Sequence, residues 1–279
     1  MNIFKLEFKS TFKGLIVWSI TVSLVLIMFL AFFPSMNTET MKQLVSLKLT
    51  AMPPFMMAAM GIPDATNFTD IFTNVIYYFG YCFQFIILAG AIYAALLGAS
   101  SIIREESEGT IEFLYAQPVT RVQIVWQKLL ATFSTYIIFC SFIALVSIIM
   151  CAIIKPPDSN FIDIITAIKK VTAGFILCGT IFICIGFAIS TIIKSAKQAT
   201  SIGIGIALLT YIIGMFSKMF SANVQALKLL KYLSPIDYAS PISVLNNGFD
   251  IVSMIIAMVL ILTSVFVAFQ IYGSKDLKS

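Results

Sequence analysis

The sequence contains no histidine, and this absence removes several kinds of functional site. Histidine metal ligands, a histidine general base and a histidine pH switch are all excluded for a chain of 279 residues with no His. No G-x-x-x-x-G-K-[ST] segment occurs either, so the chain has no P-loop for ATP. The long apolar runs hold no spaced carboxylate pair, which disfavours an intramembrane aspartyl protease. We therefore expect a protein that is not an enzyme and binds no cofactor of its own.

Charged residues are also scarce. Only 11% of the residues are charged and 59% are hydrophobic, with a mean hydropathy of +0.99. Soluble domains have about 25% charged and about 45–50% apolar residues, so this composition indicates an integral membrane protein. The net charge of +5 comes from Lys and Arg near the ends of apolar runs. Membrane topology explains that distribution, and we expect no nucleic-acid partner.

Cysteines are few and lie in or beside apolar runs, without any C-x-x-C pair. This spacing favours packing as small apolar side chains over disulfide or metal roles. The five residues are Cys82, Cys140, Cys151, Cys178 and Cys184.

Six apolar runs are long enough to cross a membrane as helices, since a span needs about 20 apolar residues. They lack the period-two alternation of a membrane β-barrel, so the expected fold is an all-α integral membrane protein forming one domain over residues 1–279. The first run is too long for the apolar region of a signal peptide and is expected to remain as a span. The runs cover residues 14–33, 76–99, 129–154, 171–193, 198–217 and 251–273.

An even number of spans places both termini on one side. The loops on that side are short and carry Lys and Arg, so we expect both termini in the cytoplasm of a plasma-membrane protein. Aromatic residues and lysines follow two neighbouring stripes before the first span, which predicts an N-terminal interfacial helix facing lipid phosphates; a plain positively charged tail is the alternative. The stripe residues are Phe4, Lys5, Phe8, Lys9, Phe12 and Lys13.

Small residues recur every four positions in the second and fifth runs. Such spacing lets helix backbones approach closely and predicts either packing within the chain or a dimer face. The residues are Gly90, Ala94, Gly98, Ala199, Gly203 and Ala207.

Two long loops lie on the other side of the predicted membrane. Loop 34–75 holds six of the 13 methionines, which favours a partly embedded or adaptable apolar surface over a soft-metal site. Loop 218–250 contains "LKLLKYLSPIDYASP", an amphipathic segment interrupted by prolines. That segment is expected at the outer membrane surface or in a re-entrant position within the bundle.

The segment "REESEGTIEFLYAQPVTR", residues 104–121, concentrates charge in an otherwise apolar region. Gly109 and Thr110 permit a turn, and Thr110 can cap a short helix that Pro118 ends. Thr120 and Gln123 then form a capping box for the next long helix. The short helix offers an apolar face for docking, although a solvated turn is the alternative. Its apolar residues are Ile111, Leu114 and Tyr115.

The same segment resembles the motif E-E-x-x-G-T-[IL]-E-x-L-L-[AS]-x-P-[VI]-[ST]-R of ATP-binding-cassette type-2 permeases. The resemblance extends to the basic N-terminus, the six spans and the Pro-containing stretch before the last span, and Tyr115 is its one departure. It implies a cytoplasmic coupling helix between spans two and three, within residues 100–128, that contacts an ATPase. The implied coupling residues are Arg104, Glu105, Glu106, Glu108, Gly109, Thr110, Ile111, Glu112, Leu114, Tyr115, Pro118 and Arg121.

The resemblance also implies the partners. Two copies of a cytoplasmic ATPase would carry ATP and Mg, and a second permease copy or homologue would complete the membrane assembly. We expect export of a hydrophobic or amphipathic cargo, such as membrane-active peptides or drugs, from a bacterial cell. The alternatives are an ion-gradient-driven carrier or channel, which the lack of charge within the apolar runs disfavours, and a non-transporting immunity or assembly protein.

Overall fold

A computed structural model of the chain consists of helices joined by turns, and no strand occurs among the residues it describes. These residues are 3–38, 40, 43, 53–59, 71, 73–109, 119–193, 195–220 and 225–274.

Within these described ranges, six helices are long and apolar enough to cross a membrane, which confirms the predicted fold class. Three of them begin eight or more residues before the predicted apolar runs, because the polar residues there continue the helical backbone, and the other three match the runs to within three residues at each end. The long helices are α1 (Ile3–Ala31), α6 (Val75–Ser101), α9 (Arg121–Ile154), α10 (Phe161–Ile192), α11 (Ala196–Phe220) and α14 (Ile251–Ser274).

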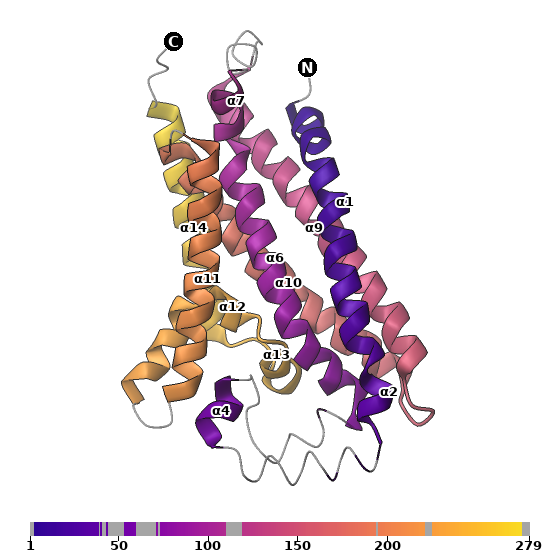
Figure 1. The fold of residues 1–279 in the computed structure, drawn as a ribbon. Coiled ribbons are helices and arrows are strands. Elements are labelled where there is room, and N and C mark those ends of the chain that lie inside the picture. Colours follow the sequence, from indigo (N-terminus) through magenta and orange to yellow (C-terminus); the bar gives the residue numbers. More distant parts are fainter. Residues whose placement is uncertain are drawn as a thin grey trace.

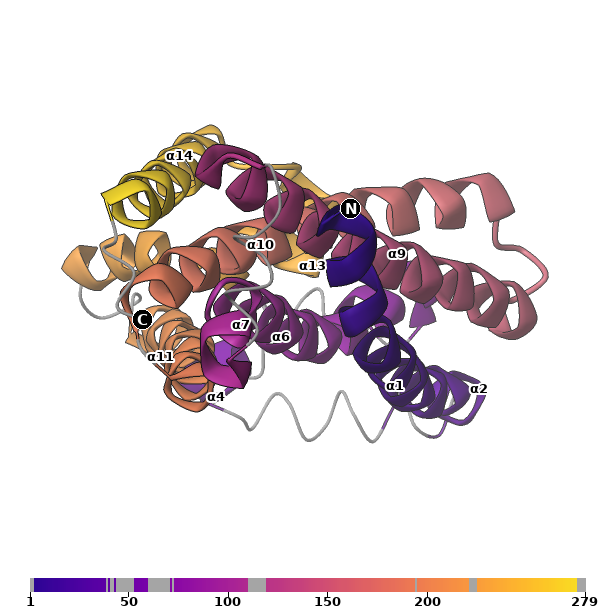
Figure 2. The same cartoon turned by 90° about the horizontal axis from the view of Figure 1, so that it is seen from above.

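Helices α6 and α10 form the centre of the bundle. In each of these two helices, 67% of the most apolar 18-residue stretch is buried, against at most 33% in the other four long helices. Figure 2 shows α1 and α9 on one side of this central pair and α11 and α14 on the other. The outer helices therefore leave most of their apolar surface for lipid.

The middle of the bundle is packed with aromatic rings. Phe175 of α10 meets Phe83 edge to face at 5.4 Å, and the Tyr136 hydroxyl donates to the Phe175 carbonyl at 3.2 Å. Glycines make room for these rings. A Cβ atom at Gly90 would lie 2.0 Å from the Phe175 ring, and one at Gly179 would lie 2.0 Å from the Tyr136 ring.

Both ends of the chain lie at one end of the bundle, together with the short helix α7 (Ile103–Glu108) (Figure 1). We call this the terminal end. The opposite end carries α2 (Phe33–Met36), α4 (Pro54–Ala59) and the connection 155–160 between α9 and α10. The prediction that both termini lie on one side is consistent with this arrangement.

The first helix differs from the prediction. Helix α1 runs without a break from Ile3 to Ala31, so the predicted interfacial residues 4–13 are the first turns of the same helix that forms the first span. The stripe Ile3, Glu7, Thr11 and Leu15 is buried against α9, where the Thr11 and Thr135 hydroxyls are 3.1 Å apart. The predicted lysine stripe at Lys5, Lys9 and Lys13 is exposed, and Phe12 is 46% exposed.

The stretch between α11 and α14 has an exposed part followed by a part that folds back into the bundle, and this second part fits the re-entrant position considered from the sequence. Residues Gln225–Leu233 form a 3-10 helix, η1, whose Leu229 and Leu233 are exposed. Helices α12 (Pro235–Tyr238) and α13 (Pro241–Asn247) then fold back among α6, α10 and α11, and most of their apolar residues are buried. This re-entrant pair places polar groups inside the opposite end of the bundle.

Candidate functional site

Helix α7 carries the first part of the predicted coupling segment. It follows α6 after a one-residue interruption at Ile102 and is capped at its C-terminus by Gly109, whose φ of 68° lies in the left-handed region that favours glycine. Arg104, Glu105 and Glu106 lie on this helix, and Glu108 is its last residue. We define α7 and the side chains that hold it as the α7 anchor.

A buried lysine joins α7 to two long helices. The Lys128 ammonium of α9 lies 2.9 Å from Glu7 Oε2 of α1 and 2.5 Å from Glu105 Oε1 of α7. It also donates to the Ser101 carbonyl at 2.6 Å. A lysine ammonium has three donors, so these three acceptors satisfy it completely. The side chains of Lys128 and Glu7 are only 1% and 3% exposed.

An arginine closes the same cluster from the side of α7. Arg104 Nη1 lies 3.6 Å from Glu7 Oε1, and it also donates to the Ser10 hydroxyl. Its other terminal nitrogen donates to Ser100 Oγ at 3.2 Å. Glu7, Arg104, Glu105 and Lys128 thus form a neutral group of two acids and two bases. Such a group is costly to break, because removing one partner leaves the others buried and uncompensated.

Burial also changes the acidity of the anchor. Desolvation raises the pKa of Glu105 above its ordinary value, and the opposing attraction of Lys128 is the smaller effect. The folded protein therefore holds a proton on Glu105 more readily than the unfolded chain does. Protonation would weaken the tie between α7 and Lys128.

Two serines connect α7 to the remaining side of the bundle. Ser190 of α10 is fully buried and accepts from the backbone N–H groups of Ile102 and Ile103 at 2.9 and 3.0 Å. These are N–H groups at a helix start that need a partner outside the helix. Ser107 of α7 accepts from the Ala196 N–H of α11 at 3.1 Å. Helix α7 is thereby hydrogen-bonded to α10 and α11.

Helix α9 begins as predicted. Thr120 accepts from the Gln123 N–H at 3.3 Å, and Gln123 Oε1 accepts from the Thr120 N–H at 3.1 Å. This confirms the predicted capping box. In the first turn, Arg121 donates to the Gly273 carbonyl at 3.1 Å and so ties α9 to the last turn of α14.

Part of the predicted coupling segment lies outside the described residues. The apolar docking face and its flanks belong to this part, so their placement stays a prediction. The residues concerned are Thr110, Ile111, Glu112, Leu114, Tyr115 and Pro118.

The small-residue stripes contact helices of the same chain. A Cβ atom at Gly98 would lie 2.3 Å from the Ile183 carbonyl oxygen of α10, and one at Gly203 of α11 would lie 3.2 Å from the Ala95 carbonyl oxygen of α6. Ala94, Ala199 and Ala207 are fully buried. All six residues of the two stripes are buried inside the single chain, so they leave no open face for a second copy.

Sequence reasoning missed the anchor residues Glu7, Lys128 and Ser190. Glu7 and Lys128 lie outside the apolar runs and resemble ordinary charges at span ends. One indication was available for Glu7, the only acidic residue among the first 38, because it shares a four-residue spacing with Ile3, Thr11 and Leu15. No comparable pattern identifies its partner, which is 121 positions away.

The anchor is suited to mechanical coupling. Glu7, Arg104, Glu105 and Lys128 each have an oppositely charged neighbour, and no group of metal ligands occurs in the described part of the chain. The five cysteines are buried and free of disulfides. Ion pairs and hydrogen bonds instead connect α7 to α1, α9, α10 and α11, while Arg121 connects α9 to α14.

Six apolar helices in the described part of the chain, with an ionic anchor at one end, define a multi-pass membrane protein. A protein-family model described as ABC-2 family transporter protein matches residues 1–277. The chain therefore belongs to the ABC-2 transporter family. Members are transmembrane components, generally non-catalytic, that in general pair with an ATP-binding-cassette ATPase. No curated protein sequence matches the chain.

Proposed function

We propose that this chain is the transmembrane subunit of an ATP-driven exporter. A separate ATPase, present in two copies with ATP and Mg, would dock on the segment from Arg104 to Arg121 on the cytoplasmic side. A second permease copy or homologue would complete the translocation path. The α7 anchor is the observation that carries this proposal, because it ties the start of the segment to four long helices.

The anchor supplies a route from ATP hydrolysis to the membrane. A force on the segment would act first on α7, and the ion pairs of Glu105 and Arg104 would pass it to α9 and α1. The Ser190 and Ser107 contacts would pass it to α10 and α11. A nucleotide or a cargo molecule can shift the permease between two conformations only if it has different affinities for them. For such a shift to reach the membrane, the contacts of α7 must stay intact while the helices move.

The cargo we favour is hydrophobic or amphipathic. The exposed surfaces of the long helices are apolar, and the described part of the Met-rich loop places Met56 at the surface, 47% exposed. Methionine side chains repack easily around apolar molecules of different shapes. These features support membrane-active compounds, including peptides, as cargo.

Co-purification with an ATPase tests the proposal. The chain is co-expressed with candidate ATP-binding-cassette ATPases from the same genome, and both the retained ATPase and its hydrolysis rate are measured in lipid nanodiscs. We expect stable co-purification, loss of the ATPase with Ile111→Asp, and retention with the conservative control Ile111→Leu. Full retention of the ATPase by Ile111→Asp would contradict docking through this face.

Transport separates the proposed exporter from the alternatives. In proteoliposomes, export should require ATP and the ATPase. Flux driven by an ion gradient through this chain alone would instead indicate a carrier. Protection of cells by the chain together with a hydrolysis-deficient ATPase would indicate an immunity protein that binds without transporting.

A further inference from the structure

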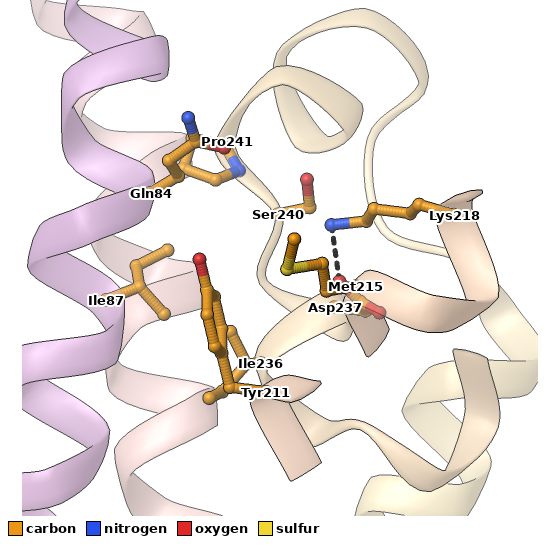
Figure 3. Close-up of a pocket in the computed structure, with 9 residues that line it drawn as sticks. All are labelled: Gln84, Ile87, Tyr211, Met215, Lys218, Ile236, Asp237, Ser240 and Pro241. Carbon is orange, nitrogen blue, oxygen red and sulfur yellow. Dashed lines mark ion pairs between the residues drawn. The ribbon is translucent and has the colours of Figure 1, made fainter. Parts of the chain in front are cut away.

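A small polar cavity lies at the opposite end of the bundle from the α7 anchor. It has a volume of about 30 Å³ and is bounded by α6, α11 and the re-entrant residues that begin with α12. Figure 3 shows Tyr211, Lys218 and Asp237 around it, with Gln84 on the facing helix. A cavity of this size holds one or two water-sized groups, so it fits a small polar head and not a whole cargo molecule.

An ion pair between two elements forms one wall of the cavity. Lys218, in the last turn of α11, places its ammonium 2.6 Å from Asp237 Oδ1 of α12. The Asp237 side chain is 11% exposed, whereas that of Lys218 is 40% exposed. The lysine can therefore leave for water, while the carboxylate stays inside the protein.

The second oxygen of the carboxylate has no hydrogen-bond partner. Asp237 Oδ2 and the hydroxyl of the fully buried Ser234 are both buried and unsatisfied. Gly214 borders both atoms: a Cβ atom there would lie 2.3 Å from Asp237 Oδ2 and 2.7 Å from Ser234 Oγ. A buried acceptor without a donor is destabilising, so a donor group placed here would recover that free energy.

The chemistry of the cavity selects the kind of donor. Only one carboxylate is present, and the described part of the chain holds no group of three metal-ligating side chains, which disfavours a divalent metal. A primary ammonium carries one charge and three donors, and the Lys218 side chain already provides one. Ile87, Met215 and Ile236 line the same cavity and suit an alkyl chain attached to such a head.

We propose that this cavity recognises the primary ammonium group of an amphipathic molecule, and that Lys218 is an internal occupant which the incoming group displaces. We take this amphipathic molecule to be the exported cargo, and this assignment rests on the proposed export function. Displacement would release α11 from the re-entrant helix α12, since their ion pair would be replaced by one with the ligand.

Thermal unfolding of the full-length chain in lipid nanodiscs tests the proposal without any ATPase, so its failure is separate from failure of the export function. The probe is n-hexylamine, which is protonated at neutral pH as lysine is. The controls are n-hexanol and hexyltrimethylammonium, which lacks N–H donors. A ligand that binds only the folded state raises Tm by an amount that grows with ln(1 + [L]/Kd), so fitting the shift against ligand concentration gives the half-saturating concentration. We expect hexylamine alone to raise Tm.

Variants identify the site. Lys218→Met removes the internal occupant and should lower the half-saturating concentration of hexylamine by about tenfold, if Lys218 fills the cavity in about nine molecules of ten. The matched control is Lys231→Met, because Lys231 pairs at 3.7 Å with Asp250 and both side chains are about half exposed. The control should respond as the wild type does.

A double variant without charges at positions 218 and 237 is included in case a single substitution prevents folding. Lys218→Met combined with Asp237→Asn removes both partners of the pair, so no uncompensated charge remains, and it should lose the response to hexylamine. The proposal is overturned if this double variant responds as the wild type does, if n-hexanol gives an equal shift, or if Lys218→Met leaves the half-saturating concentration unchanged.

The lipid composition distinguishes two sources of the ammonium group. If the natural occupant is an ethanolamine headgroup, nanodiscs containing phosphatidylethanolamine will stabilise Lys218→Met and weaken its response to hexylamine. If the occupant is a separate amphipathic amine, discs of phosphatidylcholine with or without phosphatidylethanolamine will give the same response. Either result supports ammonium recognition and assigns its source.

Discussion

Replacing Lys128 by methionine gives the sharpest test of the α7 anchor. The change keeps the apolar length of the side chain but removes the ammonium that joins Glu7, Glu105 and the Ser101 carbonyl. Glu7 would keep only Arg104, at 3.6 Å, and Glu105 would lose the only partner that the described ion pairs give it. Breaking a buried ion pair from one side costs about 3–5 kcal/mol.

The expected loss is large enough to measure directly. At about 2–4 °C per kcal/mol for chains of comparable size, Lys128→Met should lower Tm by roughly 6–20 °C. The five cysteines are all buried, so a thiol-reactive dye added during heating reports unfolding. Lys13→Met is the matched control, because Lys13 is exposed on the same end of the bundle, and it should change stability by less than about 0.5 kcal/mol.

A compensating variant separates charge from packing. Adding Glu7→Gln and Glu105→Gln to Lys128→Met removes the uncompensated acids and should restore most of the lost stability. The reasoning fails if Lys128→Met is as stable as Lys13→Met. It also fails if the triple variant is no more stable than Lys128→Met, since packing and not charge would then account for the loss.

Three further predictions concern individual contacts. Because burial raises the pKa of Glu105, the folded state binds the proton on this carboxyl more tightly than the unfolded state does. The Tm of the wild type should therefore rise relative to that of Glu105→Gln as the pH falls from neutral toward the raised pKa. An equal pH dependence of Tm in the two proteins would contradict this prediction. Gly90→Ala should cost about 1–3 kcal/mol because of the Phe175 ring, whereas Gly205→Ala, which meets nothing within 4 Å, should be neutral or stabilising in a dye-monitored melt. Ser190→Ala should cost about 1–3 kcal/mol and increase hydrogen exchange at Ile102 and Ile103, and unchanged exchange there would show that Ser190 does not hold α7.

The sequence predicted those features of the fold that depend on local composition. Apolar length identified all six spans, and the T-x-x-Q spacing identified the start of α9 at Thr120. The four-residue spacing of Gly90, Ala94 and Gly98 indicated a close approach between helices, but it could not show that the neighbour is α10 of the same chain.

The features that sequence reasoning missed depend on distant pairs. A lysine at a span end has the same local pattern whether it faces water or Glu7, so the burial of Lys128 could not be inferred. The stripe at Phe4, Phe8 and Phe12 suggested an interfacial helix, but the neighbouring stripe through Glu7 determines how α1 packs on α9. Likewise, the prolines near residue 235 indicated a break and not its depth in the bundle.

The connection 155–160 and the last turn of α14 lie at opposite ends of the bundle (Figure 1), which makes the chain well suited to vectorial labelling. Asp158 and Ser274 are both exposed, and none of the native cysteines is. Single cysteines introduced at these two positions would therefore react with a membrane-impermeant maleimide, while the buried native cysteines would not. In sealed cells one position should react and the other only after permeabilisation, which would fix the orientation of the α7 anchor in the membrane.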